Sequence, residues 1–107
     1  MPSDINFTFL TGTVISVPSW VPLAHNKRAL VFTIRNNESF KLADGRNATH
    51  VNNIVVEVLG RNAEKYFSEI SLNKKVQVVG YIRVDEMKGS DKTRVRAFRI
   101  EDISGDE

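Results

Sequence analysis

The sequence V-N-N-I-V-V-E-V-L at residues 51–59, which ends at Gly60 and leads into residues 62–70, decides the fold. Its β-branched residues predict a strand, and the glycine predicts the end of that strand. In the next segment Asn62 is a suitable helix N-cap, and apolar residues recur at the spacing of one helical face. These apolar residues are Ala63, Tyr66, Phe67 and Ile70. We therefore expect a strand followed by a short helix that closes one end of the domain.

Four further strands are predicted from alternating or β-branched runs. The alternating segment at residues 28–35 places Leu30, Phe32 and Ile34 on the expected core face. In the first strand, Gly12 suits a sharp bend that lets one strand be shared between two halves of a barrel. The five strands are expected at residues 7–17, 28–35, 51–59, 75–84 and 92–103, joined by polar loops at residues 18–27, 36–50 and 85–91.

The order of these elements, three strands, one helix and two strands, defines the fold class. Five antiparallel strands that close on themselves, with a helix between the third and the fourth, form the OB-fold, a small Greek-key barrel. A chain of 107 residues with 41% hydrophobic residues can bury one core but not two. We therefore expect an all-β protein, a five-stranded Greek-key OB-fold barrel with one short helix, as a single domain over residues 1–107.

The composition argues against an enzyme. The chain has no cysteine, which excludes disulfides, cysteine-bound zinc and thiol nucleophiles. His25 and His50 lie in expected loops without an acidic neighbour to orient them, and the adjacent Asp85 and Glu86 point to opposite faces. We expect a non-catalytic binding protein without metal or cofactor. Because the sequence holds no apolar run of about 18 residues and no signal-peptide pattern, we expect it in the cytoplasm, away from membranes.

The net charge of +2 conceals two basic segments. Residues 18–50 hold five basic residues against two acidic ones, which gives +3, and residues 88–99 hold five against one, which gives +4. The last seven residues hold four acidic residues and no basic one. This asymmetry favours a protein with a face that binds a polyanion.

Three short motifs lie in register with the predicted strands. They are Leu10-Thr11-Gly12-Thr13-Val14, Val55-Val56-Glu57-Val58-Leu59-Gly60-Arg61-Asn62-Ala63-Glu64 and Val76-Gln77-Val78-Val79-Gly80-Tyr81-Ile82. Together they resemble the bacterial single-stranded-DNA-binding OB-fold proteins, the SSB family and its smaller relative, primosomal replication protein N (PriB). Gly60-x-x-Ala63-Glu64 is similar to the SSB pattern, whereas the chain length and residues 100–106 are more similar to PriB.

The resemblance implies a role and partners. It implies a protein that binds single-stranded DNA during DNA replication or replication restart, as a primosome component. It also implies contacts with replication or primosome proteins, such as a restart helicase, and a homodimer. The first strand fits a second subunit, because Phe7, Phe9 and Ile15 face opposite to Leu10 and Val14 and leave both faces apolar.

Binding of single-stranded nucleic acid requires cations along a groove for phosphates and flat surfaces for bases. In an OB-fold the ligand lies across the second and third strands, flanked by the loop after the first strand and the loop between the last two. Trp20 either stacks on a base or covers the apolar end of the barrel, and Phe40 either stacks or fixes the long loop to the sheet. The expected nucleic-acid-binding residues are Trp20, Lys27, Arg28, Arg35, Phe40, Lys41, Arg46, Lys88, Lys92 and Arg94.

The third predicted strand carries no aromatic residue at the positions where relatives commonly place a base-stacking one. Val51, Asn53 and Leu59 occupy these positions. With few aromatic residues available, we expect charge to contribute more to affinity than stacking.

Two alternatives to a PriB-like protein stay open at this point. One is an SSB variant of the phage or plasmid type, and the other is an OB-fold adaptor that binds only protein. Cold-shock-type RNA binding is less well supported, because a strand-borne run of aromatic residues flanked by Lys and Gly is missing.

Overall fold

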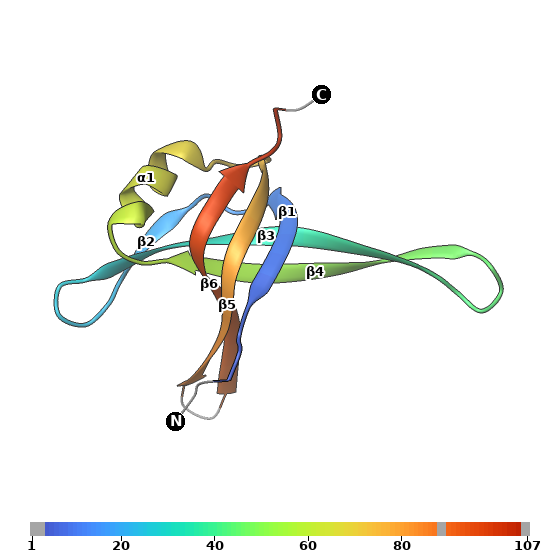
Figure 1. Cartoon of the computed structure of the whole chain (residues 1–107), viewed down its shortest axis with the longest axis horizontal. Helices are drawn as coiled ribbons and strands as arrows, with labels where there is room; N and C mark the ends of the chain where they lie inside the picture. The colour runs from blue at the N-terminus through green and yellow to red at the C-terminus, as the bar shows by residue number, and fades with distance from the viewer. Residues whose placement is uncertain (1–3, 88–89, 106–107) are drawn as a thin grey trace.

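A computed structural model describes residues 4–87 and 90–105, with the side chains of residues 85–92 outside the description. The described residues form strands and one helix, as the sequence predicts (Figure 1). The elements are β1 (Thr8–Val14), β2 (Ser19–Pro22), β3 (Arg28–Lys41), β4 (Asn47–Val58), α1 (Arg61–Glu69), β5 (Lys75–Met87) and β6 (Ser90–Asp102).

Five of the strands close into a barrel in the order β1-β5-β6-β4-β3, and β1 returns to β3 through the pairs Thr13↔Arg35 and Val14↔Ile34. All pairs are antiparallel except β4 with β6. The sharing of the first strand between two parts of the barrel is confirmed, because β1 pairs with β5 as far as Thr13 and with β3 at Thr13 and Val14. A Cβ atom at Gly12 would lie 2.8 Å from the carbonyl oxygen of Arg35, so no larger residue fits at this position without a shift. The OB-fold prediction is confirmed.

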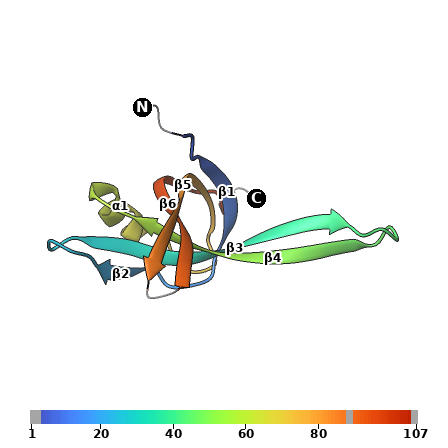
Figure 2. The same ribbon diagram turned by 90° about the horizontal axis from the view of Figure 1, so that it is seen from below.

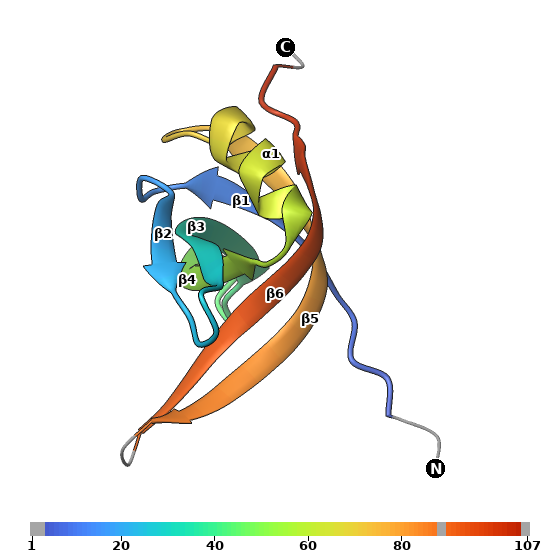
Figure 3. The ribbon, with the colours of Figure 1, turned by 90° about the vertical axis from the view of Figure 1, so that its left-hand side faces the viewer.

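The core occupies the inside of this barrel. Leu30, Phe32 and Ile34 are buried, as their alternation predicts, and Val56 and Val58 face them from β4. Helix α1 lies beside β6 and closes one end (Figure 3). Its buried side chains are Ala63 and Tyr66, followed by Ile70 at the C-cap, and the Tyr66 hydroxyl accepts a hydrogen bond from the Ile100 N–H at 3.1 Å.

Two details of the predicted helix are wrong. The N-cap is Gly60, with a φ of 79° and no side-chain hydrogen bond, rather than Asn62. Glycine reaches this left-handed conformation without strain, so the chain turns directly out of β4 and the asparagine falls inside the first helical turn. Phe67, expected on the buried face, stays 46% exposed and lies against Trp20 instead.

The prediction of a long loop at residues 36–50 is also wrong, because this segment forms a two-stranded ribbon that we call the arm. β3 and β4 stay paired as far as Lys41↔Asn47, around a turn that contains Gly45 with a φ of 89°. The arm extends away from the barrel (Figures 1 and 2), so both of its faces meet water. Its strands therefore do not require apolar residues on either face. Backbone pairing, which needs no apolar side chain, holds it together.

The other predicted loops also contain paired strands, and the first strand is shorter than predicted. Residues 19–22, expected in a loop, form the edge strand β2, with Trp20 opposite Leu30. β5 and β6 remain paired to Met87↔Ser90, so the polar turn expected at residues 85–91 is shorter than predicted. The first strand, expected to reach residue 17, ends at Val14.

Two of the four acidic residues at the end of the chain are paired within the fold. Glu101 binds Arg99 at 2.7 Å, and Asp102 lies 3.4 Å from the Lys74 Nζ. Hydrogen bonds from the Ser104 hydroxyl and backbone N–H, in that order, hold the pKa of Asp102 below its ordinary value. Asp106 and Glu107 lie outside the described residues. No helix in the part of the chain that the structure describes is long and apolar enough to cross a bilayer.

Candidate nucleic-acid interface

The outward face of the barrel carries a hollow of about 430 Å³, which we call the outer hollow. Because Leu30, Phe32 and Ile34 point inward, the residues between them on β3 point outward. The hollow therefore has an apolar floor of valines from three strands and a cationic wall from β6. Its lining residues are Val21, Val31, Val55, Thr93 and Arg94.

A second hollow of about 270 Å³, the mouth hollow, opens on β1, β4, β5 and β6. Leu10, Ile54, Ile82 and Val95 give it apolar walls. Its polar lining residues are Thr8, Asn53, Thr93 and Arg94. Thr93 and Arg94 also line the outer hollow, so both residues contribute to the two hollows.

Glu57 is buried on the outward side of β4, only 2% exposed, beneath two arginines of β6. Its Oε1 lies 3.4 Å from the Arg96 Nη2 and its Oε2 lies 3.8 Å from the Arg94 Nη1. The buried Nε of Arg96 has no hydrogen-bond partner among the described residues. Glu57 is thus a carboxylate partner shared by two guanidiniums of β6.

Arg35 extends this cationic face toward the arm. It is exposed, it shares the outward side with Val31, and it stands opposite Asn53. No aromatic residue lies at these positions of β4. Asn53 and Val51 occupy them instead, and Val51 is 47% exposed.

The arm carries three of the predicted residues. Phe40 is 45% exposed and pairs across the ribbon with Ala48. Lys41 is exposed, and Arg46 forms an exposed ion pair with Asp44 at 2.6 Å. Exposed ion pairs of this kind are weak, so a phosphate can compete for the guanidinium.

The base of the arm is tied to the barrel by asparagines. Asn36 donates a hydrogen bond to the Thr11 carbonyl of β1 at 2.8 Å, and Asn52 donates one to the Asn36 side chain at 3.3 Å. These bonds fix the direction in which the arm leaves the barrel.

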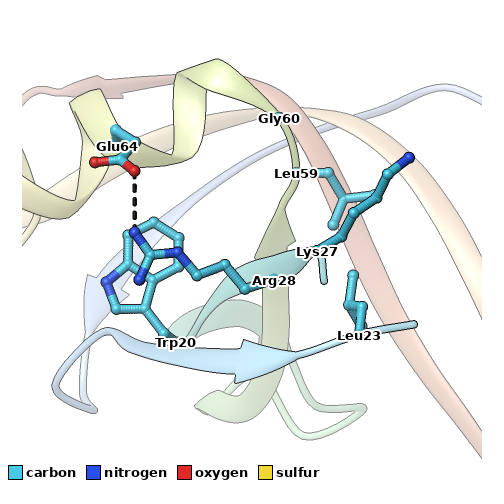
Figure 4. A pocket seen from close by; sticks show the side chains of 7 residues that line it. All are labelled: Trp20, Leu23, Lys27, Arg28, Leu59, Gly60 and Glu64. Atoms are coloured by element: carbon cyan, nitrogen blue, oxygen red, sulfur yellow. Dashed lines mark hydrogen bonds and ion pairs between the residues drawn. The ribbon is translucent and has the colours of Figure 1, made fainter. Parts of the chain in front are cut away.

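Trp20, Lys27 and Arg28 lie elsewhere, at the helix end, around a third hollow of about 450 Å³ (Figure 4). The Arg28 Cζ lies 3.8 Å from the centre of the Trp20 ring, and its Nη2 lies 3.0 Å from the Glu64 Oε1. The indole packs against the core, and its ring centre is 5.3 Å from that of Phe67. Because Trp20 pairs with the inward-facing Leu30, it occupies the opposite side of the sheet from the outer hollow.

The structure thus brings Arg35 and Arg94 to one outward face, with Phe40, Lys41 and Arg46 on the arm that continues from it. It does not bring Trp20, Lys27 and Arg28 to that face. Lys88 and the side chain of Lys92 lie outside the described residues.

Sequence reasoning missed Glu57 and Arg96 as members of this face. The spacing of Arg94 and Arg96, two residues apart on a strand, already places both on one side. A single carboxylate within the apolar run V-V-E-V-L is a second signal, because a buried charge requires a partner.

A closed five-stranded barrel with a helix after its third strand, and an outward face whose cations come from its second and fifth strands, defines an OB-fold of the oligonucleotide-binding kind. Residues 5–102 match the model of the Single-strand binding protein family. The chain belongs to this family.

Solved structures agree on the fold. A deletion mutant of the single-stranded DNA binding protein from Thermus aquaticus matches with a TM-score of 0.83 and 21% identity, over 94% of this chain and 51% of that one. The chain therefore spans about half the length of that protein. The small single-stranded DNA-binding protein from Streptomyces coelicolor (TM-score 0.73, 17% identity) and the Plasmodium falciparum SSB in complex with ssDNA (TM-score 0.80, 14% identity) each match over 94% of this chain and 95% of theirs. No curated protein matches the sequence.

Proposed function

We propose that this protein binds single-stranded DNA without catalysing a reaction, as one OB-fold domain. The observation that carries the proposal is the outward face of β3, β4 and β6. On this face Arg94 lines two hollows with apolar walls, and Arg35, opposite Asn53, lies on the strand that continues into the exposed arm. Cations beside apolar surfaces match the phosphates and bases of a single strand. Membership of the Single-strand binding protein family supports this ligand.

Labelled oligo-dT is expected to bind more tightly than a duplex of equal length. Neutralising about four phosphates gives a slope near −3 for log K against log salt concentration on single strands. Fluorescence anisotropy at several salt concentrations measures both quantities. Equal affinity for the duplex, or no binding at low salt, would contradict the proposal.

The adaptor that binds only protein would gain support from that negative result. One surface fits it, a hollow of about 390 Å³ beside α1 with the exposed apolar residues Val17, Phe67 and Leu72. Exposed apolar patches of this kind occur at protein–protein interfaces.

The finer proposal is a primosome component of the PriB type that acts in replication restart with a partner such as a restart helicase. It rests on the resemblance of residues 100–106 to that group. The alternative is an SSB variant of the phage or plasmid type.

We also propose a homodimer. Phe9, on the outward side of β1, is 59% exposed and stands beside Val79 of β5, and Phe7, just before this strand, is 63% exposed. Among the described strands, β1 meets β3 only at Thr13 and Val14, which leaves most of one β1 edge without a strand partner. Sedimentation velocity at micromolar concentration is expected to show a dimer, and a monomer would contradict this proposal.

A further inference from the structure

We propose that a single strand bound on the outward face continues over the edge of β2 into the hollow of about 450 Å³ at the helix end, which we call the helix-end hollow. There Lys27 and Arg28 bind its phosphates, and a base lies beside Trp20. This inference rests on the proposed function and extends the binding path to a second side of the barrel.

A single strand of the sheet separates the outer hollow from the helix-end hollow. β2 is the last strand in the sheet order, and among the described strands it pairs only with β3. Trp20 and Val21 are neighbours in β2, so their side chains point to opposite sides. Val21 lines the outer hollow, and Trp20 lines the helix-end hollow. A polymer on the outward face therefore reaches the second hollow by passing over β2 alone.

The edge of β2 suits such a crossing. The strand has only four residues and ends at Pro22, which has no backbone N–H to donate. Short edges that carry proline are poor templates for a further β-strand. A nucleic-acid strand, which needs no backbone pairing, fits this edge better than a polypeptide strand does.

Lys27 is held at the hollow by a tight turn (Figure 4). His25 and Asn26 form the centre of this turn, with φ values of 61° and 59°. The Lys27 N–H donates to the Ala24 carbonyl at 3.3 Å, and its carbonyl accepts from the Leu23 N–H at 2.7 Å. The side chain is exposed and forms no ion pair with any residue that the structure describes. A cation is thus presented to the hollow from a fixed backbone position.

Arg28 is ordered but accessible. Its guanidinium is stacked on the Trp20 ring and paired with Glu64, and the side chains of Arg28 and Glu64 are 50% and 71% exposed. An ion pair this exposed is weak, so a phosphate oxygen can replace the carboxylate. Because the guanidinium is already stacked, it loses little rotamer freedom when a phosphate binds.

The walls of the helix-end hollow suit a base. Leu23 and Leu59 line it beside the indole, which is itself partly exposed. Bases of a single strand bind to apolar and aromatic surfaces next to cations that hold the phosphates. The hollow therefore offers the same two kinds of contact as the outward face.

The chain has a single tryptophan, so its fluorescence reports on this hollow. An oligo-dT of about 25 nucleotides, long enough to pass β2, is expected to change Trp20 fluorescence at saturation. An oligo-dT of about six nucleotides, which covers only the outward face, is expected to leave it unchanged. Unchanged fluorescence with the long strand would overturn the inference, as would an equal change with both strands.

Lys27→Ala tests the phosphate contact. The variant is expected to bind the long oligo-dT about threefold to tenfold more weakly, with a salt slope shallower by about 0.7, and to bind the short one as wild type does. Lys65→Ala is the matched control, because this exposed lysine of α1 does not line the hollow. Wild-type affinity of Lys27→Ala for the long strand would overturn the inference, and so would an equal loss in the control.

Glu64→Gln is expected to have the opposite effect. It removes the carboxylate that competes for Arg28, so the long strand should bind about twofold to threefold more tightly while the short strand is unaffected. Glu69→Gln makes the same charge change at another exposed position of α1 and should have a smaller effect. An equal gain in both variants would assign the effect to net charge and overturn the contact with Arg28.

The proposed function and this inference fail in different ways. If wild-type protein binds neither oligo-dT, the proposed function is rejected before any variant is compared. If it binds both strands but Trp20 fluorescence and Lys27→Ala show no response to length, only this inference is overturned. An acidic segment of a partner protein would then be the occupant that Lys27 and Arg28 fit.

Discussion

Replacing residues 38–50 of the arm by Asn-Gly, so that the turn joins Asn37 directly to Val51, is expected to weaken binding of long oligo-dT at least tenfold. These two residues pair across the ribbon, and Asn-Gly forms the tight hairpin turn that such a pair requires. The deletion removes two cations, Lys41 and Arg46, and the exposed ring of Phe40. About two phosphate contacts and one stacked base at roughly 1–3 kcal/mol account for the loss.

The deleted segment also contains Glu38 and Asp44, so the net charge of the protein does not change. Apart from Ala48, every deleted residue is exposed, and the barrel should therefore melt within a few degrees of wild type. Anisotropy with long and short oligo-dT measures the effect, since a short strand that reaches only the barrel face should lose little affinity. Equal affinity of the two proteins for the long strand would show that the arm does not contact the ligand.

Gly80→Ala is expected to destabilise the fold by about 3–5 kcal/mol, a large part of the total stability of a domain this size. A Cβ atom at this position would lie 2.8 Å from the Cα of Ala97 and still closer to the carbonyl oxygen of Arg96. Both are backbone atoms of β6, at the place where the β5–β6 register shifts. They cannot move aside as a side chain would, so the two strands must separate.

Thermal unfolding followed by circular dichroism measures this effect, with an expected fall in Tm of about 15–30 °C. Gly105→Ala is the matched control, because a Cβ atom there meets nothing within 4 Å. A Gly80→Ala protein that melts within about two degrees of wild type would show that β5 and β6 do not approach as closely as described.

The barrel could be predicted because buried positions of a strand or helix carry apolar residues at a regular spacing in the sequence. Leu30, Phe32 and Ile34 alternate with residues that face outward, and this period of two predicts both the strand and its buried side. The same reasoning predicted the helix from Ala63, Tyr66 and Ile70. These signals depend on local spacing alone.

The arm could not be predicted, because its sequence shows no regular spacing of apolar residues. Both of its faces meet water, so its strands carry polar residues on each side and read as a loop. Their pairing is a property of the backbone, which carries no information about side-chain type.

The position of Trp20 was undetermined for a different reason. It lies between two prolines in a short segment without a regular spacing of apolar residues. The sequence was therefore compatible with stacking on a base and with packing over the end of the barrel. The structure packs it against the core, with Arg28 over its ring and Phe67 beside it. The side it occupies follows from the pairing of β2 with β3.

By itself, the sequence determined the barrel class, the inward set of apolar residues, and the presence of basic segments without a strand-borne aromatic. Only the tertiary structure decided which cations share a face. Arg94 and Arg96 meet Glu57 although the carboxylate and Arg96 are 39 residues apart, because β4 and β6 lie side by side in the closed barrel. The spacing of apolar residues within one strand or helix shows which side is buried. A charged face, in contrast, forms only when the fold brings separate strands together.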